Sequence, residues 1–357
     1  MTDNVVIDEL AIPRSIDVEE AADFIAMTRV RNEIEAQVVG NYDLAFEPAE
    51  LLPHWQNAYE PKRLLVARLD GAIVGRGVYE TSDVDGSPVA WIGVEVLERA
   101  RGRGIGAALL ARLEEWAAAD SRSIVQGYLL TRVDEPGDRL PSPTGFGAVP
   151  QGSPGVRFAL AHNYVLEQVE RFSRLDLPVN TAELDRLLQQ AQDASADYRV
   201  VLWSGRTPPE FVEDMAVLHS RMSTDAPAAG LDVDEEVWTA QRVRNDDDLL
   251  ESSPRTLLYA VAQHVASRRL VGFSVLDVPP ETSRPVVQED TLVLKEHRGH
   301  RLGMLVKLAN IAQLAKVSPG HPSITTFNAE ENRHMLSVNE AIGFVPVGYD
   351  GAFKKVL

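Results

Sequence analysis

Apolar and polar residues alternate from Arg63 to Glu80, on both sides of an Asp70-Gly71 pair. This alternation predicts a β-hairpin, because successive strand side chains point to opposite faces and Asp-Gly suits a tight turn. The apolar, β-prone run from Ala90 to Val96 predicts a further strand. After a glycine-rich stretch, Ala107 to Ala119 repeats apolar residues at helical spacing. The first half of the chain therefore predicts a hairpin, a strand, a loop and a helix.

The second half of the chain shows the same order of patterns. Alternation predicts a hairpin over Thr256 to Val278 and a strand over Asp290 to Leu294. Helical spacing then predicts a helix over Leu302 to Lys316, followed by a strand over Ile324 to Asn328. We therefore expect two units of similar construction.

A long internal repeat accounts for this similarity. VLERARGRGIG, from Val96 to Gly106, and VLKEHRGHRLG, from Val293 to Gly303, share five identical positions at an offset of 197 residues. Upstream, Val74-Gly75 recurs as Val271-Gly272 at the same offset of 197 residues. Before it, Leu64-Leu65 recurs as Leu257-Leu258 at an offset of 193 residues. An insertion of four residues in the second hairpin loop, near His264 to Ser267, explains the difference. A repeat of this length indicates a duplicated domain.

The segment between the two copies predicts a linker. Leu177-Pro178 ends the first unit, and Thr181 to Ala194 reads as a helix with Thr181 as its N-cap. A strand beginning at Tyr198 opens the second unit. We therefore predict a first domain over residues 1–177, a helical linker over 178–197 and a second domain over 198–357. A chain of 357 residues is also longer than one hydrophobic core usually supports.

Composition narrows the class of protein. Apolar residues make up 45% of the chain and charged residues 25%, which is typical of globular proteins. The net charge of −18 disfavours nucleic acid and anionic membranes as partners. The first residues, MTDNVVIDEL, carry no basic segment before an apolar run, and no apolar stretch approaches the roughly 20 residues that span a bilayer, so we expect a cytoplasmic protein. The oligomeric state has no signal in the sequence.

The absence of cysteine limits the chemistry. With no cysteine the chain has no disulfide, no thiolate metal site and no cysteine nucleophile. His297 and His300 are the nearest pair of metal-ligand type, but no further ligand stands at a suitable spacing on the same segment, so we expect no metal. Any acyl transfer must then proceed without an acyl-cysteine intermediate.

The glycine-rich stretch between the first predicted strand and helix suits a phosphate. Glycines let backbone N–H groups approach an anion at a helix N-terminus, and arginines add positive charge there. The stretch lacks the Gly-Lys-Ser/Thr of a Walker loop, and its glycines stand two apart, unlike those of a dinucleotide fingerprint. The residues concerned are Arg101, Gly102, Arg103, Gly104, Ile105, Gly106 and Ala107.

This stretch resembles the (Arg/Gln)-x-x-Gly-x-(Gly/Ala) signature of GNAT N-acetyltransferases, which Arg101, Gly104 and Gly106 match in full. The resemblance implies an α/β (α+β) fold of two tandem GNAT-like domains, each with a mixed, mostly antiparallel sheet flanked by helices. It also implies acetyl-CoA as cofactor, with the pyrophosphate held by backbone amides around Arg103 to Ala107. The tandem form resembles mycothiol synthase and related actinobacterial two-lobe acetyltransferases. In mycothiol synthase the C-terminal lobe is the catalytic one, and the resemblance implies the same lobe here, although the first lobe has the better loop.

The second copy matches the signature in part. Arg298 and Gly303 occupy the outer positions, while Arg301 replaces the middle glycine. The corresponding loop residues are Arg298, Gly299, His300, Arg301, Leu302 and Gly303. Farther on, this copy resembles the family more closely, through Asn328, Asn332 and the VNEAIGF run from Val338 to Phe344. In the first copy, RFALAHNYVLEQV has Asn163 in place of the glycine of that run.

The resemblance implies direct attack of an amine on the thioester in a ternary complex. Backbone N–H groups of Val96 or Val293 would polarise the thioester carbonyl. Many relatives use a tyrosine to protonate the leaving thiolate, but Ala159 and Asn339 stand at that position. Glu95, Glu289 and Asp290 are candidate bases on the predicted strands, and the last two read equally as a solvated acidic turn.

Three functions remain open at this point. The first is an acyltransferase that acetylates the primary amine of a small molecule. The second is an activity similar to mycothiol synthase, on an amino-sugar or cysteinyl conjugate. The third is a non-catalytic, CoA-responsive binding protein, which the missing tyrosine favours. The second loop also has two interpretations, as a CoA site or as solvated residues at the start of a helix.

Overall fold

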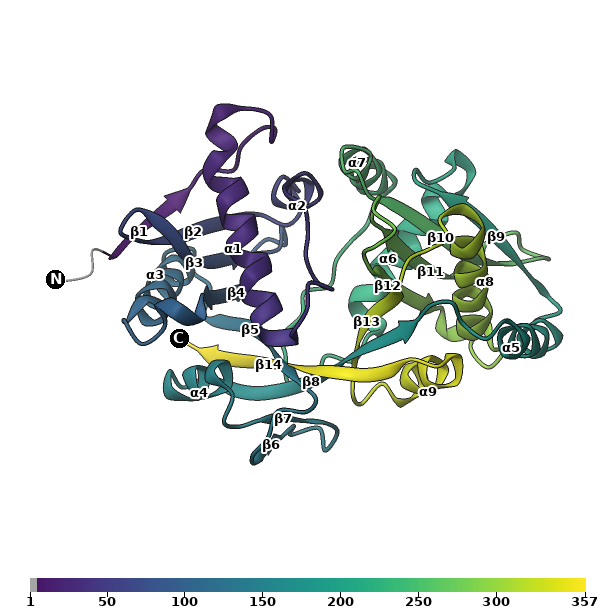
Figure 1. Cartoon of the computed structure of the whole chain (residues 1–357). Coiled ribbons are helices and arrows are strands. Elements are labelled where there is room, and N and C mark those ends of the chain that lie inside the picture. The colour runs from purple at the N-terminus through teal and green to yellow at the C-terminus, as the bar shows by residue number, and fades with distance from the viewer. Residues whose placement is uncertain (1–4) are drawn as a thin grey trace. The chain divides into compact units, whose positions relative to one another are not determined.

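A computed structural model describes residues 5–357 (Figure 1). Contacts within the chain divide the described residues into two units. The first unit comprises residues up to 170 together with 228–234 and 348–357. The second comprises 171–227 and 235–347. Among the described helices, none is both long and apolar enough to cross a bilayer.

The first unit is built on a mixed sheet. Its strands follow the spatial order β1, β2, β3, β4, β5, β14 and β8. Their bounds are β1 Val5–Leu10, β2 Lys62–Leu69, β3 Ala72–Glu80, β4 Val89–Val96, β5 Ile124–Arg132, β8 Val165–Asp176 and β14 Val345–Val356, and a small separate hairpin consists of β6 Arg139–Pro141 and β7 Ala148–Pro150. The helices are α1 Ala22–Val39, α2 Pro48–Trp55, α3 Ile105–Ala119 and α4 Pro154–Ala161. Both β8 and β14 continue from one unit into the other.

Helices cover both faces of the first sheet, as adjacent residues of β3 show. Arg76 contacts Met27 of α1, whereas a Cβ on Gly77 would lie 3.3–3.4 Å from Leu109 and Leu113 of α3. Because neighbouring strand residues point to opposite faces, α1 and α3 lie on opposite sides of the sheet. The leucines of α3 recur at helical spacing and are buried, which explains why this segment forms a helix against the sheet.

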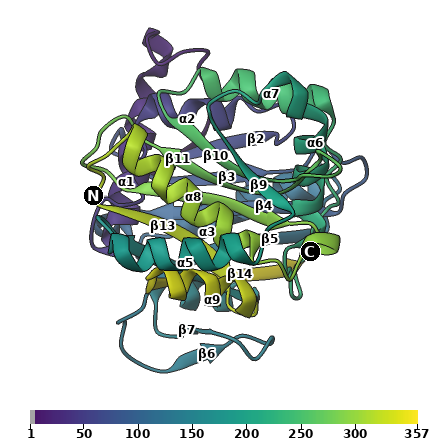
Figure 2. The same ribbon diagram turned by 90° about the vertical axis from the view of Figure 1, so that its right-hand side faces the viewer.

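The second unit repeats this plan. Its strands follow the order β9, β10, β11, β12 and β13, and β8 lies next to β13. Their bounds are β9 Tyr198–Ser204, β10 Thr256–His264, β11 Leu270–Val278, β12 Val286–Val293 and β13 Ser323–Ala329. The helices are α5 Thr181–Asp193, α6 Val212–Asp225, α7 Ala240–Glu251, α8 Leu302–Val317 and α9 Arg333–Ile342 (Figure 2). The mixed, mostly antiparallel fold class expected from the sequence is confirmed.

Most predicted elements are present with small shifts. Both hairpins form, with turns at residues 70–71 and 265–269. The strand predicted over Asp290 to Leu294 begins earlier, at Val286, because the residues before Asp290 also pair with β11 and β13. The predicted N-cap at Thr181 is wrong: the Asn180 side chain caps α5 by accepting hydrogen bonds from the N–H groups of Ala182 and Glu183.

The predicted linker region 178–197 contains α5, which packs into the second unit. Leu187 and Ala191 are buried there in one cluster with Leu305 and Leu308 of α8. At the other end of the chain, residues 348–357 pair with β5 of the first unit, from Gly348 opposite Arg132 to Val356 opposite Ile124. The first sheet is therefore completed by the C-terminal segment.

Candidate cofactor and active site

The first glycine-rich loop connects the end of β4 to the start of α3. Gly102 and Gly104 have φ angles of 75° and 80°, in the left-handed region that glycine occupies without a steric cost. Gly104 is the N-cap of α3, and the first intrahelical bond runs from Ala108 N–H to its carbonyl. The first-turn N–H groups, on residues 105–107, thus have no intrahelical acceptor and carry the positive end of the helix dipole.

Open space lies in front of this loop. A Cβ placed on Gly102 or Gly104 would meet no protein atom within 4 Å. Arg101 folds back so that its Nε donates to the Val96 carbonyl at 3.0 Å, which closes the loop onto the strand end. Gly106 is close-packed instead, because a Cβ there would lie 3.3 Å from the Phe158 ring. The loop thus presents free amides and an unobstructed surface to an anion.

The second loop keeps this backbone shape despite its different sequence. Gly299 has a φ of 90°, and Arg301 is the left-handed N-cap of α8 with a φ of 53°. A left-handed arginine costs about 1–2 kcal/mol relative to glycine. Arg298 Nε donates to the Val293 carbonyl at 3.0 Å, as Arg101 does to Val96 in the first unit. No protein atom lies within 4 Å of a Cβ placed on Gly303.

The arginines of the second loop have protein partners. Arg298 forms an ion pair of 2.8 Å with Asp225, whose side chain is only 3% exposed. Asp225 also pairs with Lys295 at 3.0 Å. Arg301 donates to Gln190 of α5 at 3.3 Å. The two loops thus share a backbone conformation, and both arginine side chains of the second loop are held by protein side chains.

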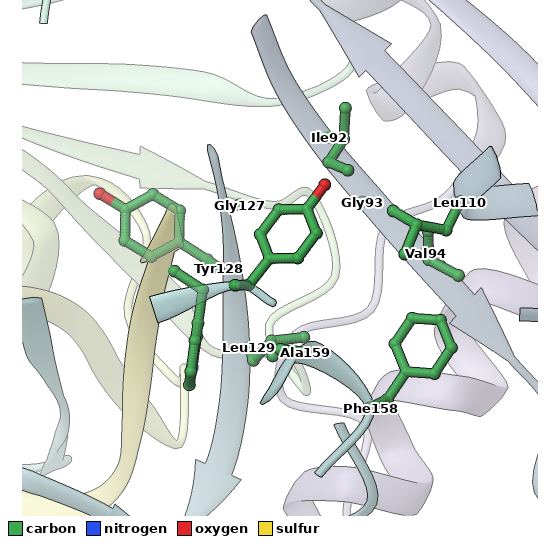
Figure 3. Close-up of a pocket in the computed structure, with 11 residues that line it drawn as sticks. Ile92, Gly93, Val94, Leu110, Gly127, Tyr128, Leu129, Phe158 and Ala159 are labelled. Atoms are coloured by element: carbon green, nitrogen blue, oxygen red, sulfur yellow. The ribbon is translucent and has the colours of Figure 1, made fainter. Parts of the chain in front are cut away.

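In the first unit, the two strands next to the loop diverge and form a cavity. β4 and β5 are paired in parallel only from Val89 to Trp91. Beyond this point about 430 Å³ of space, part of it open to solvent, lies between the strands and α4 (Figure 3). Its lining is largely apolar and consists of Ile92, Gly93, Val94, Leu110, Gly127, Tyr128, Leu129, Phe158, Ala159, Tyr164 and Phe353. Such a cavity suits an elongated, mainly apolar part of a ligand.

Strand geometry directs one backbone N–H of each unit into the space between diverging strands. Leu97 N–H donates to Val74 O at 2.9 Å. Because antiparallel bonding alternates along a strand, the preceding N–H, of Val96, points away from β3 and toward β5. In the second unit Leu294 N–H donates to Val271 O at 2.9 Å, so the N–H of Val293 points toward β13. β12 and β13 pair only at Val286 and Val287 and then separate.

A β-bulge distinguishes β12 from β4. Thr291 lies opposite Ser274, and Gln288 lies opposite Leu276, so Glu289 and Asp290 together face Val275. The Gln288 amide donates to the Val275 carbonyl at 2.7 Å and so satisfies an acceptor that the bulge leaves unpaired. The register of β4 against β3 runs without interruption from Val96 to Trp91. The two acidic residues predicted as candidate bases thus occupy a bulge in the second unit.

The environment of the bulge raises the pKa values of both carboxyl groups. Burial raises the pKa of Glu289 to about 8, and the negative charges of Asp277 and Asp290 add to this effect. Glu289 is exposed at the surface, although many protein atoms surround its carboxyl group and desolvate it. Burial also raises the pKa of Asp290 to about 6, with a contribution from Glu236. At neutral pH Asp290 is mostly ionised and Glu289 mostly protonated.

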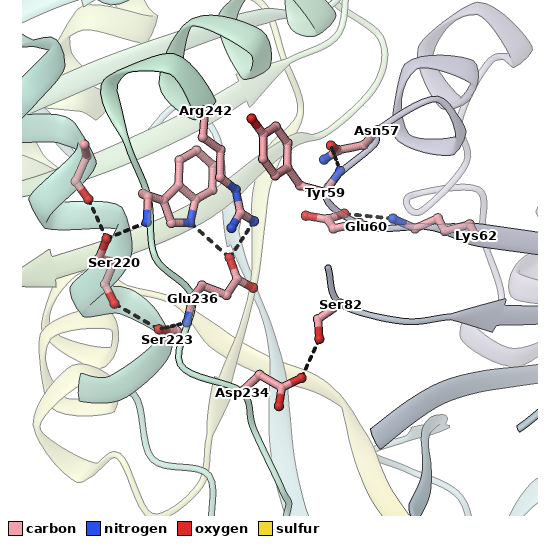
Figure 4. Close-up of polar contacts among 12 residues, drawn as sticks. Asn57, Tyr59, Glu60, Lys62, Ser82, Ser220, Ser223, Asp234, Glu236 and Arg242 are labelled. Atoms are coloured by element: carbon pink, nitrogen blue, oxygen red, sulfur yellow. Dashed lines mark hydrogen bonds and ion pairs between the residues drawn. The ribbon is translucent and has the colours of Figure 1, made fainter. Parts of the chain in front are cut away.

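Glu236 is held in place by the aromatic side of the second unit (Figure 4). Its carboxylate accepts from Trp238 Nε1 at 3.0 Å and from Arg242 Nη2 at 2.7 Å. The Arg242 guanidinium lies 4.3 Å from the centre of the Trp238 ring. Ser220 and Ser223 of α6 accept backbone N–H groups from this segment. The charge that acts on Asp290 is therefore fixed in position.

Glu95 has a different environment in the first unit. Its carboxylate forms a bidentate ion pair with Arg76, at 2.6 and 2.8 Å. Burial opposes ionisation of Glu95, but the charge and hydrogen bonds of Arg76 outweigh it and lower the pKa. A carboxylate held in this way is a weaker base than Asp290.

The asparagines predicted to contact the cofactor lie around α9. Asn339 Nδ2 donates to Asn328 Oδ1 at 2.6 Å, which joins α9 to the end of β13. Asn332 is the N-cap of α9 and accepts from Met335 N–H at 3.3 Å. The helix ends at Gly343, whose φ is 112°, and in the first copy Asn163 takes the same left-handed role with a φ of 65°. The change from glycine to asparagine therefore preserves the local turn.

The histidines near the second loop pack on a tyrosine. His297 Nδ1 and the Tyr198 hydroxyl lie 3.0 Å apart, and the His264 and His300 rings also contact the Tyr198 ring. Within residues 5–357, no group of three or more metal-ligating side chains is placed to hold a metal ion.

Comparisons with known proteins agree with this geometry. Residues 29–135 match the model of the acetyltransferase (GNAT) family. A tandem GNAT protein from the clavulanic acid biosynthesis pathway superposes with a TM-score of 0.73 at 22% identity, over 99% of this chain and 98% of that one. The chain has a tandem GNAT fold. A GCN5-related N-acetyltransferase from Sphaerobacter thermophilus also matches, with a TM-score of 0.58 at 13% identity, over 99% of this chain and 95% of that one. No curated protein matches this tandem GNAT chain by sequence.

The GNAT fold places one further carboxyl group that sequence reasoning missed. Glu35 of α1 pairs with Arg31 at 2.7 Å, while its Oε2 is buried without a partner. Burial raises the pKa of Glu35 to about 7, and Arg31 only partly offsets this. An acidic residue four positions after an arginine on a helix is a common surface pattern, so burial of Glu35 could not be predicted from the residues alone.

Proposed function

We propose that this tandem GNAT protein is an N-acetyltransferase that transfers an acetyl group from acetyl-CoA to the primary amine of a small molecule. The family match and the fold support acetyl transfer in general. The observation that carries the specific proposal is the first loop with its adjoining cavity. Free amides at the start of α3 suit a pyrophosphate, and the apolar space between β4 and β5 suits the pantetheine arm.

In this proposal each part of the loop has a role in binding the cofactor. The first-turn amides at residues 105–107 hold the pyrophosphate, and the Gly102 and Gly104 positions leave room for it. The second loop, from Arg298 to Gly303, has the same backbone shape and can hold a second CoA at its amides. Acetyl-CoA supplies the activated acetyl group as a thioester.

We assign amine activation to the bulge of the second unit, so the acetyl-CoA that reacts is the one that the second loop would hold. An aliphatic amine is mostly protonated at neutral pH and must lose a proton before attack. Asp290, with a pKa of about 6, is ionised at neutral pH and is a stronger base than an ordinary aspartate. The N–H of Val293, which points between β12 and β13, would polarise the thioester carbonyl. The amine then attacks the carbonyl carbon directly, with no acyl-enzyme, in keeping with the absence of cysteine.

A specific observation favours a second candidate function, a CoA-responsive binding protein. Ala159 and Asn339 stand where an acidic side chain close to the sulfur is expected, and neither can donate a proton as an acid. Such a protein would bind CoA without turnover.

Free-thiol release from acetyl-CoA in the presence of a panel of primary amines separates the two functions. The proposal expects amine-dependent thiol release together with an acetylated amine in the mass spectrum. Binding of CoA without release in any amine would favour the binder.

A matched pair of variants tests the second loop in the same assay. Gly303→Glu places a negative charge in open space, and Gly303→Gln is its uncharged control, at a position without left-handed strain. Loss of turnover in the Glu variant alone would place the working cofactor at the second loop.

A further inference from the structure

A lysine of the second unit is buried without a polar partner. Lys307 lies on α8 and is 1% exposed. Within the described part of the chain, no hydrogen bond or ion pair reaches its Nζ. This atom lies 5.9 Å from the centre of the Phe344 ring. Lysines normally extend their ammonium group to water. Burial of this one therefore requires an explanation.

The internal repeat shows which space Lys307 faces. At the offset of 197 residues, Lys307 corresponds to Leu110, which lines the cavity of the first unit. Phe344 follows the left-handed turn of its copy just as Tyr164 does, and Tyr164 also lines that cavity. Lys307 thus faces the space between β12 and β13, into which the Val293 N–H also points.

Two asparagines complete a polar lining in the second unit. Asn339 corresponds to Ala159, and by the strand registers Asn328 corresponds to Leu129, both of which line the first cavity. Asn339 is 1% exposed, and its Oδ1 is buried without a hydrogen-bond partner. An unsatisfied acceptor and an unpartnered amine at one strand opening point to a ligand that supplies the missing contacts.

The first copy shows that the fold does not need an amine at this place. Leu110 fills the same position of α3 and packs in the apolar core. A buried lysine is costly compared with a leucine, so its presence in one copy alone indicates a chemical role.

We propose that Lys307 is the general acid of the second unit, and that it protonates the sulfur of CoA as the acetyl group leaves. This inference rests on the proposed acetyltransferase function. The amine nitrogen forms a bond to the carbonyl carbon, the carbon–sulfur bond breaks, and its electron pair stays on sulfur. The Lys307 ammonium gives one proton to that sulfur. Asp290 takes one proton from the ammonium form of the amine before attack and passes it to water, and it takes a second from the nitrogen as the amide forms. Water then returns a proton to Lys307 and accepts one from Asp290, so that amine and thioester become amide and thiol.

The acidity of Lys307 suits this step. Burial lowers its pKa to about 7, and it is the sole cause of the shift, with no carboxylate or cation of the neighbouring helices and strands contributing. An ordinary thiol has a pKa of roughly 8.5, so transfer of the proton from the ammonium to the thiolate is favourable. A general acid is most effective when its pKa lies near the working pH.

The matched test replaces Lys307 with the residue of the first copy. Lys307→Leu should lower kcat by about 100-fold, at the low end of typical general acid catalysis, while KM for acetyl-CoA stays within about twofold. In the wild type kcat should fall above about pH 7 as the ammonium is lost. This alkaline limb should be absent from the variant, while the acid limb of Asp290 remains. Lys307→Met repeats the comparison with an unbranched apolar side chain of similar length.

Two kinetic outcomes would overturn the proposal. One is an unchanged kcat and pH profile in Lys307→Leu. The other is a raised KM with kcat unchanged, because Lys307 would then only bind the cofactor.

A second measurement does not depend on turnover. In protein labelled with ¹³C-lysine, the resonance absent from Lys307→Leu should titrate near pH 7 and shift when CoA is added. A resonance that titrates near 10, or that CoA does not move, contradicts the proposal. If the wild type acetylates no amine while this resonance behaves as expected, the acetyltransferase function fails but the placement of Lys307 beside the sulfur stands.

Discussion

At the scale of single residues, Glu289 and Asp290 owe their properties to one extra residue in a strand. The bulge leaves these two carboxyl groups facing a single residue, Val275, of the neighbouring strand. Burial raises both pKa values; the charges of Asp277 and Asp290 bring that of Glu289 to about 8, and the charge of Glu236 brings that of Asp290 to about 6. A pair of this kind offers one protonated and one ionised carboxyl group at neutral pH.

Asp290→Asn should therefore abolish the base while preserving the shape of the site. We expect kcat to fall by about 100-fold or more. The acid limb of the pH–rate profile, centred near pH 6 in the wild type, should disappear. Thiol release measured from pH 5 to pH 9 checks both effects.

Glu95→Gln is the matched comparison for Asp290→Asn. It removes half of the Arg76 ion pair, so it should lower the free energy of unfolding by about 3 kcal/mol and leave the pH profile in place. The assignment of the base to the second unit is contradicted if Glu95→Gln, and not Asp290→Asn, removes the acid limb.

Lys307 should also make stability depend on pH. Its pKa is lowered to about 7 in the folded state from 10.5, so the unfolded chain binds the proton more tightly between these values. Between about pH 7 and pH 10.5, Lys307 should therefore make the free energy of unfolding rise with pH. Below pH 7 its ammonium is charged in both states, and the full destabilisation from burying that charge is present.

Lys307→Leu should accordingly be more stable than the wild type by a few kcal/mol at pH 6.5. The advantage should shrink as the pH approaches 10. Urea unfolding at several pH values measures the difference. A difference that is constant with pH would mean that Lys307 is not buried as an amine with a lowered pKa.

Individual residues mark the limit of what the sequence could reveal. Arg101, Gly104 and Gly106 were identifiable because a phosphate loop needs glycines at fixed spacing. Glu35 and Lys307 were not, because a charged residue on an amphipathic helix gives no sign of whether it faces water. Alignment of Lys307 with Leu110 was the one available signal for the lysine.

At the scale of elements, the hairpins and the loop-to-helix junctions followed from periodicity. The bulge in β12 did not, because the four consecutive polar residues from Gln288 to Thr291 do not show where an extra strand residue lies. The predicted strand over Asp290 to Leu294 missed the part that lies before the bulge. Strand pairing, rather than local sequence, determines where such an irregularity falls.

A substitution at Asn180 tests whether side-chain capping stabilises the start of α5. Asn180→Ala removes the acceptor for two first-turn N–H groups and should lower the free energy of unfolding by about 1 kcal/mol. Asn180→Ser keeps a capping oxygen and should remain close to the wild type. Urea unfolding gives both values. Equal losses in the two variants would mean that capping does not explain the role of Asn180.

At the scale of the whole molecule, the end of the second copy forms part of the sheet of the first unit. The first sheet depends on residues 348–357, since β5 pairs with nine residues from Gly348 to Val356. A cut at the sequence boundary predicted near residue 177 would remove these residues and expose the edge of β5.

A fragment of residues 1–177 should therefore fail to fold cooperatively. We expect aggregation, or a thermal transition far below that of the full chain, because nine paired positions of β5 lose their partner. Circular dichroism during heating measures this, with the full chain as control. A fragment that unfolds cooperatively at the temperature of the full chain would show that the first domain is independent of the C-terminal segment.

The central claim is that amides at the start of α3 hold the diphosphate of CoA. Calorimetric titration of CoA into the wild type, Gly104→Asn and Gly104→Asp tests it most directly. Both side chains tolerate the left-handed φ of 80°, so the two variants differ chiefly in one negative charge placed in the open space of the loop. The account predicts binding to the wild type and to the Asn variant, with affinity of the first loop at least about tenfold weaker in the Asp variant. No heat of binding with the wild type, or equal affinities in the two variants, would contradict it.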